Sequence, residues 1–227
     1  MNMSIFTELG PMGLSIVLIL LLLSIVSWAI IIEKIILLWR ADRESRRFLY
    51  IFELYSDWRD IDQETKSYRY SPFVKIFQRA IALTAPTTFS KAITERARAD
   101  FGAREASQSQ AIDTRPLLES AISAEILAFE KRLIFLSSTV SASPFLGLFG
   151  TVWGVMRAFM NISARGSAAL TVIGPGIAEA LVTTVVGLAV AIPVLFAYNM
   201  IVDKIRKYEA FLENFYPVLM KKLNSEK

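Results

Sequence analysis

A carboxylate and two adjacent hydroxyls lie within one long apolar stretch of the chain. The segment PGIAEALVTTVVGLAVAIP, residues 175–193, contains Glu179, Thr183 and Thr184. An ionised group at bilayer depth is costly and usually faces a cavity, a partner or the interior of a helix bundle. These three side chains therefore indicate a polar pathway or a polar contact inside a membrane.

The composition removes most enzyme chemistry. Cys and His are both absent, which excludes disulfides, thiol nucleophiles, the usual zinc and haem ligands and every His-based triad or proton relay. The chain also lacks a P-loop and a dinucleotide fingerprint. Its 25 basic residues are interleaved with 21 acids, which argues against nucleic-acid binding. We expect no enzymatic activity, no cofactor and no bound metal.

Three stretches are long and apolar enough to cross a lipid bilayer. The 227 residues are 54% hydrophobic with a mean hydropathy of +0.44, although 20% are charged. Residues 9–32, 133–156 and 180–202 each contain no charged residue. At about 1.5 Å per residue, each can cross a hydrocarbon core of about 30 Å. We therefore predict an all-α membrane protein with three transmembrane helices.

The positive charges predict how these helices are oriented. Arg157 and Arg165 are the basic residues between the second and third stretches, and none precedes the first. This bias places the N-terminus in the periplasm and the C-terminus in the cytoplasm. The first stretch follows Glu8 and lacks a small-residue cleavage site, so we interpret it as a retained anchor. The predicted segments are a periplasmic N-terminus (1–8), transmembrane helix 1 (9–32), a cytoplasmic helical domain (33–132), transmembrane helix 2 (133–156), a periplasmic loop (157–168), transmembrane helix 3 (169–202) and a cytoplasmic C-terminal helix (203–227).

The predicted cytoplasmic domain contains a clear amphipathic pattern. In SPFVKIFQRAIAL, apolar residues recur at i, i+3, i+4, i+7 and i+8, and Ser71 and Pro72 are suited to begin a helix. The apolar positions are Phe73, Ile76, Phe77, Ala80 and Ile81. We interpret this stripe as a helix that packs on its neighbours. Helical patterns over 117–132 and 206–223 are expected to extend the second and third transmembrane helices without a break, which gives long helices in the cytoplasm.

Small and hydroxyl residues form one face on each of the last two transmembrane helices. On the second helix they are Ser143, Gly147, Gly150, Thr151 and Gly154. On the third helix they are Gly176, Ala180, Thr184, Gly187 and Ala191. Small residues permit close approach of membrane helices, so these two faces are predicted to pack together. Pro144 is expected to bend or loosen the second helix.

Thr151 and Thr184 are predicted to lie at equal depth. Thr151 is 19 residues from Arg132 and Thr184 is 19 residues from Asp203, which places both hydroxyls about 28 Å from these cytoplasmic charges. Glu179 lies roughly 8 Å farther out. Two alternatives stay open: a membrane threonine commonly bonds a carbonyl of its own helix, and Glu179 is also suited to the dipole at a helix N-terminus.

The arrangement of the acid has two consequences. Glu179 lies about 40° from Thr183 but about 140° from Thr184 around the helix. The face with Glu179 and the face with Thr184 can therefore both contact protein only if other helices flank this helix on two sides, as in a ring of subunits. Glu179 is also the only acid within the spans, and it lies near the outer end of the third. Hydroxyls order water but do not hold a proton at ordinary pH. We therefore expect another polypeptide to supply the carrier carboxylate, inserted where the two small-residue faces meet.

Two segments carry a family resemblance. SPFLGLFGTVWGVMRAF and PGIAEALVTTVVGLAVAIPVLFAYN resemble the signature segments of the TolQ/ExbB/MotA family of proton-driven motor subunits, and SWAIIIEK is similar to its TolQ branch. The resemblance implies that Thr151 and Thr184 match the pore threonines and that Glu179 matches the pore glutamate. Thr183 stands where the family often has Ala, so the role stays open between Thr183 and Thr184.

The same resemblance implies partners and a function. It implies a homo-pentamer in the bilayer around a dimer of a TolR-like single-span protein with a protonatable Asp, and a TolA-like protein as a further partner. It implies an inner-membrane subunit of a Gram-negative cell that uses proton-motive force to energise the Tol-Pal system. That system supports outer-membrane integrity and cell division. The alternatives are an ExbB-type subunit that energises TonB-dependent outer-membrane transport, and a non-conducting membrane scaffold.

Overall fold

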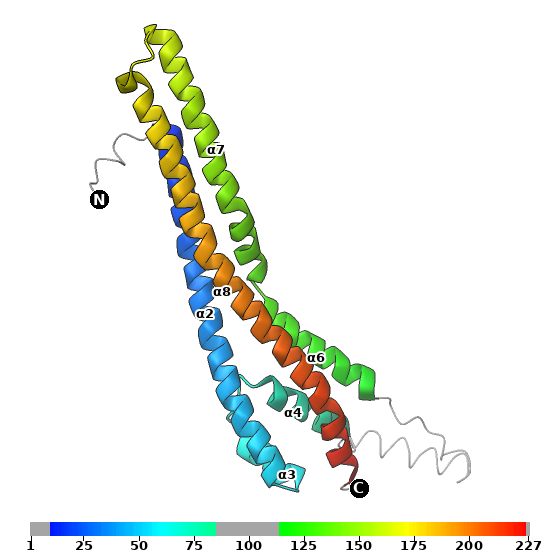
Figure 1. Cartoon of the computed structure of the whole chain (residues 1–227). Coiled ribbons are helices and arrows are strands. Elements are labelled where there is room, and N and C mark those ends of the chain that lie inside the picture. The colour runs from blue at the N-terminus through cyan, green and yellow to red at the C-terminus, as the bar shows by residue number, and fades with distance from the viewer. Residues whose placement is uncertain (1–9, 85–113, 226–227) are drawn as a thin grey trace. The chain divides into compact units, whose positions relative to one another are not determined.

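The computed structural model describes residues 10–84 and 114–225 of the chain. Within these residues it is all-helical, as predicted (Figure 1). The helices are α2 (Pro11–Leu54), α3 (Trp58–Thr65), α4 (Pro72–Thr84), α6 (Thr114–Glu130), α7 (Leu133–Arg165) and α8 (Leu170–Ser225). The predicted N-terminal segment 1–8 and residues 85–113 of the predicted cytoplasmic domain lie outside the described residues.

Three of these helices have the length and composition of membrane spans. Helices α2, α7 and α8 contain apolar windows with mean hydropathies of 2.9, 1.5 and 2.4, respectively. They contain the three stretches predicted from the sequence. Only 33% of each window is buried inside the chain, so most of this apolar surface needs lipid or other protein to cover it.

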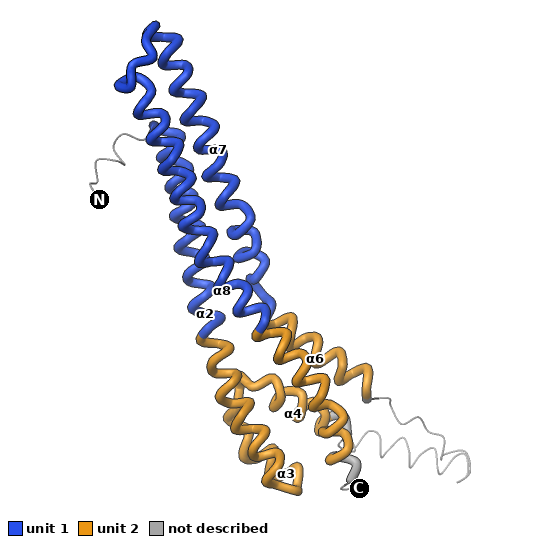
Figure 2. The backbone as a smooth tube through the Cα atoms, in the orientation of Figure 1, with its two compact units in different colours: residues 1–35, 130–203 blue, residues 36–129, 204–227 orange. Residues whose placement is uncertain are grey.

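The helices divide into two compact units (Figure 2). Unit 1 consists of residues 1–35 and 130–203, and unit 2 consists of residues 36–129 and 204–227. Unit 1 thus contains the first part of α2, all of α7 and most of the apolar part of α8. In its core Ile16 and Leu20 of α2 pack with Val190 of α8.

Unit 2 is built around a cluster of phenylalanines. Rings from α2, α4 and α8 lie with centroids 5.0 to 6.2 Å apart, mostly tilted or edge to face. The rings belong to Phe48, Phe52, Phe73, Phe77 and Phe215. This geometry suits the aromatic quadrupole and adds stability beyond the buried area.

The predicted amphipathic helix of unit 2 is confirmed as α4. It begins at Pro72, a favoured first residue because proline has no N–H to leave unpaired. Ser71 precedes it, and its hydroxyl lies 3.0 Å from that of Ser45 on α2. Four of the five stripe residues are buried, and Ile81 is half-buried.

Two expectations about helix continuity have different outcomes. Helix α8 runs unbroken to Ser225, so the predicted extension of the third span is confirmed. The predicted continuity of 117–132 into the second span is wrong, because α6 ends at Glu130 and α7 begins at Leu133. Arg132 adopts a left-handed conformation with φ of 71°, which a right-handed helix cannot contain. Its guanidinium group instead pairs with the carboxylate of Glu33. Helix α7 continues through Pro144.

Candidate functional site

The threonine hydroxyls of α8 lie against α7 within unit 1. The Oγ1 atom of Thr184 donates a hydrogen bond of 3.1 Å to the carbonyl oxygen of Gly147, and the residue is half-buried. Thr183 is fully buried, and its hydroxyl donates at 2.8 Å to the carbonyl oxygen of Ala180 in its own helix. The hydroxyl of Thr183 also lies 3.5 Å from the carbonyl oxygen of Gly147, so the two threonines differ mainly in burial, and Thr184 is the more accessible.

Glycines create the space for these contacts. A Cβ atom on Gly147 would lie 3.0 Å from the Cα atom of Thr184, and one on Gly150 would overlap the side chain of Thr183. A Cβ atom on Gly187 would lie 2.6 Å from the carbonyl oxygen of Ser143. The structure therefore brings the two small-residue faces together, and their backbones approach more closely than larger side chains permit.

Farther along the same contact, the helices are equally close. A Cβ atom on Gly154 would lie 2.6 Å from the carbonyl oxygen of Gly176 and 2.9 Å from the Cβ atom of Ala180. The two faces of this chain thus pack directly on each other, and the expected insertion of a partner carboxylate beside them stays a prediction.

Thr151 lies at the edge of this contact. It is half-buried, and its Oγ1 atom donates at 2.6 Å to the carbonyl oxygen of Leu148 in its own helix. Thr184 lies opposite Gly147, and Thr151 is four residues, about 6 Å, farther along α7. The predicted equal depth of Thr151 and Thr184 therefore holds only to within about one turn. The reason is that the two charged markers are not level: Gly147 is 15 residues from Arg132, whereas Thr184, which lies opposite Gly147, is 19 residues from Asp203.

Glu179 joins all three helices of unit 1. Its side chain is 1% exposed, and its Oε1 atom accepts a hydrogen bond of 3.0 Å from the backbone N–H of Gly13 on α2. Its Oε2 atom lies 2.6 Å from Nη1 of Arg157 on α7, an ion pair without the alignment of a hydrogen bond. Helix α8 begins at Leu170, so Glu179 does not lie at the N-terminus of its own helix and that alternative does not apply.

Sequence reasoning missed Arg157, which was assigned to a loop. The signal that identifies it is periodicity, since Arg157 follows Gly150 by seven residues and Gly154 by three, on the face of α7 that turns toward α8. Gly10 and Gly13 were also missed. They lie near the beginning of α2, where a Cβ atom on either would overlap Arg157 or Glu179, respectively.

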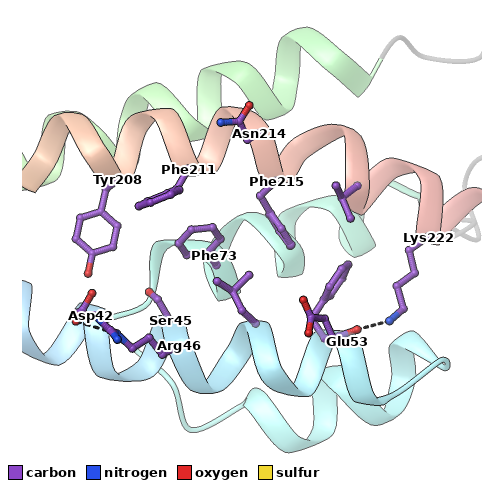
Figure 3. A pocket seen from close by; sticks show the side chains of 13 residues that line it. Asp42, Ser45, Arg46, Glu53, Phe73, Tyr208, Phe211, Asn214, Phe215 and Lys222 are labelled. Carbon is purple, nitrogen blue, oxygen red and sulfur yellow. Dashed lines mark hydrogen bonds and ion pairs between the residues drawn. The ribbon is translucent and has the colours of Figure 1, made fainter.

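Unit 2 contains a separate cavity of about 680 Å³ (Figure 3). Its lining combines aromatic residues, among them Phe73, Phe211 and Phe215, with a similar number of polar and charged ones. At its edge, Nζ of Lys222 donates to the carbonyl oxygen of Tyr55 at 2.5 Å and to that of Phe52. These contacts fasten the end of α8 to the end of α2, and the cavity is distinct from the threonines of unit 1.

Comparisons with known proteins agree with this geometry. Residues 75–214 match the MotA/TolQ/ExbB proton channel family. The Tol-Pal system protein TolQ of Haemophilus influenzae is 34% identical over 205 residues, which cover 88% of this chain and 83% of that protein. The biopolymer transport protein ExbB of Neisseria meningitidis serogroup A is 30% identical over 214 residues, 88% of this chain and 87% of its own length. TolQ of Pseudomonas aeruginosa is 41% identical over 109 residues, 46% of this chain and 47% of that protein. The chain, a multi-pass membrane protein with three apolar helices, belongs to the MotA/TolQ/ExbB proton channel family.

Proposed function

We propose that this chain is a TolQ-like stator subunit that uses proton-motive force, together with a TolR-like single-span partner, to energise a Tol-Pal system in a Gram-negative inner membrane. The observation that carries the proposal is the position of Thr151 and Thr184, half-buried at the edge of a tight α7–α8 contact. Hydroxyls in that position are available to water or to a partner helix that packs beside α7 and α8.

The hydroxyls act in this proposal by ordering water. The donor of each is already used, because Thr151 and Thr184 both donate to backbone carbonyls. A hydroxyl oxygen has two acceptor lone pairs, so each side chain still accepts a hydrogen bond from a hydrated proton or a protonated carboxyl. Neither titrates in the physiological range, so the carrier is the membrane Asp of the partner. Thr183 and Glu179 support the pathway from the core of unit 1, because both are buried there.

The exposed apolar surface supports an oligomer. The uncovered two thirds of each apolar window suit lipid on one side of unit 1 and neighbouring copies on the other. A pentamer around a partner dimer satisfies this requirement and places the Thr151 and Thr184 edge toward a central channel. In this arrangement the N-terminus is periplasmic, residues 33–132 and 203–227 are cytoplasmic, and a TolA-like protein receives the motion.

An ExbB-type function is the second candidate. The ExbB match covers the chain as fully as the TolQ match, 88% in both cases, although at lower identity. Complementation separates the two. The gene, expressed together with a TolR-like single-span protein, is expected to restore detergent resistance to a strain without TolQ. In a strain that lacks both ExbB and TolQ, the same gene is expected not to restore TonB-dependent uptake. Restored uptake without restored detergent resistance would indicate the ExbB-type function. If neither phenotype is restored although the complex assembles normally, a non-conducting scaffold would be favoured.

A further inference from the structure

The carboxylate of Glu179 lies at the beginning of helix α2. That helix starts at Pro11, and the first few N–H groups of any helix have no carbonyl partner within it. The N–H of Gly13 is one of these groups, and Glu179 Oε1 accepts its hydrogen bond at 3.0 Å. A carboxylate is favoured there because the helix dipole is positive at the N-terminus. Glu179 on α8 thus caps α2.

Gly13 of α2 and Gly10, which directly precedes α2, leave room for this cap. A Cβ atom on Gly13 would overlap the Glu179 carboxylate, and one on Gly10 would overlap the guanidinium of Arg157. The start of α2 and the residue before it therefore form a cradle, open at these two positions, that holds both members of the ion pair. Residues 10–13 read GPMG, which combines this space with a proline suited to the first helical position.

Arg157 supplies the charge that the buried carboxylate requires. The Glu179 side chain is 1% exposed, whereas that of Arg157 is 31% exposed, so the guanidinium reaches from the edge of unit 1 inward to the acid. The groups that face the carboxylate are the Gly13 N–H and the Gly10 backbone from α2, and Arg157 from α7. A buried carboxylate without a partner is strongly unfavourable.

We propose that Arg157 is a positioning residue for Glu179: it holds the ionised carboxylate in the Gly10–Gly13 cradle as a fixed charge, so that Glu179 does not carry the moving proton. The proposal rests on the proposed function, in which Glu179 belongs to the pathway, and it assigns that residue a stationary role. We call the group of Gly10, Gly13, Arg157 and Glu179 the three-helix latch. The latch fixes the spacing of α2, α7 and α8, and so the position of the nearby Thr184 edge.

The test is a double-mutant cycle in the full-length chain. The variants are Arg157→Gln, Glu179→Gln and the double variant, with Arg165→Gln as the matched control, because Arg165 is an exposed arginine of the same helix. Thermal unfolding in detergent is measured at pH 8. Arg157→Gln is expected to lower Tm by about 5 °C or more at pH 8, because the carboxylate is left uncompensated. The double variant is expected to recover at least half of that loss.

A charge-conserving variant separates charge compensation from packing. Arg157→Lys keeps a positive charge on α7, so its Tm deficit is expected to be smaller than that of Arg157→Gln. If Arg157→Gln does not fold and the double variant does, the proposal is likewise supported. Losses that simply add in the double variant, or equal deficits for Arg157→Lys and Arg157→Gln, would overturn it.

A second readout tells failure of this inference from failure of the proposed function. Partner-dependent proton flux into proteoliposomes is measured for Arg157→Lys, which keeps the charge, and for Arg157→Gln, which does not. Arg157→Lys is expected to keep more flux than Arg157→Gln. If the Tm losses are not additive but the wild type gives no partner-dependent flux, the inference about the three-helix latch would stand and the proposed function would be refuted. Normal flux with additive Tm losses would refute the latch alone.

Discussion

The hydroxyl of Thr184 donates a hydrogen bond to the carbonyl oxygen of Gly147, and this 3.1 Å bond crosses from α8 to α7. Gly147 makes the contact possible, since a Cβ atom there would lie 3.0 Å from the Thr184 backbone. The same hydroxyl keeps its acceptor lone pairs at the half-buried edge of the helix pair. One side chain thus joins two helices and remains available to a proton path.

Substitutions at Thr184 separate these roles. Thr184→Ser keeps the hydroxyl and is expected to retain much of the partner-dependent proton flux. Thr184→Val keeps the shape but leaves nothing to bond the Gly147 carbonyl or water, so flux is expected to fall about tenfold or more, the effect of losing about 1.4 kcal/mol in the transition state. Thr151→Val is expected to behave similarly. Equal flux in the Val variants and the wild type, with partner binding intact, would remove both threonines from the pathway.

The close approach of α7 and α8 predicts contrasting effects of one added methyl group. Gly154→Ala places a Cβ atom 2.6 Å from the carbonyl oxygen of Gly176, so the helices must separate. Overpacking of this kind costs about 1–3 kcal/mol. Gly174→Ala is the matched control, because beyond the neighbouring residues of its own helix its added Cβ meets no atom within 4 Å. Thermal unfolding in detergent is expected to show a lower Tm for Gly154→Ala and an unchanged or higher Tm for Gly174→Ala; the reverse order would contradict the packing.

The sequence predicts the spans and their small-residue faces because both depend on local patterns. Charge-free stretches of sufficient length identify the helices, and the spacing of Gly147, Gly154 and Gly187 identifies the faces that meet. Relative depth was less predictable. The prediction for Thr151 and Thr184 took Arg132 and Asp203 as level markers, and only the contact between Thr184 and Gly147 reveals that these two charges lie about one turn apart in depth.

The partner of Glu179 was not predictable from charge counting. Arg157 follows a charge-free stretch and so counted as a loop residue, although α7 continues to Arg165. The second contact comes from Gly13, which is 166 residues away in the chain. Such a distant pair becomes apparent only when tertiary packing brings the start of α2 against α8.

Burial gives unit 2 a pH-dependent contribution to stability. Tyr208 is 5% exposed, and burial, followed by the negative charge of Asp42, raises the pKa of its phenol above the ordinary value of 10.0. A raised folded-state pKa contributes stability that is complete below the unfolded value and is lost as pH rises. Wild type is therefore expected to lose its advantage over Tyr208→Phe from about pH 10 upward. Chemical unfolding at pH 8 and pH 11 measures this difference, and an advantage that grows with pH would contradict the assignment.

The proposed topology predicts which introduced cysteines react from outside the cell. The chain has no native cysteine, so each introduced thiol is the only one. An impermeant thiol reagent is expected to label Ser167→Cys, between α7 and α8, and to leave Ser56→Cys unlabelled in intact cells; both serines are exposed. The same map predicts labelling at Ser4 and none at Ser107, positions outside the described residues. Labelling of Ser56→Cys or Ser107→Cys in intact cells would contradict the proposed topology. Permeabilised cells serve as the control that these cysteines can react.

Proton flux through reconstituted protein tests directly whether the proton carrier belongs to this chain or to the proposed partner. The purified chain, with and without a TolR-like single-span protein, is placed in proteoliposomes under an imposed potential, and internal pH is followed with an entrapped dye. We expect proton-tight vesicles for the chain alone, because Thr151 and Thr184 do not titrate and Glu179 is proposed to be a fixed charge. With the single-span protein we expect flux that disappears when its membrane Asp is changed to Asn. Robust flux through the chain alone, abolished by Glu179→Gln, would contradict the proposal, because the carrier would then belong to this chain.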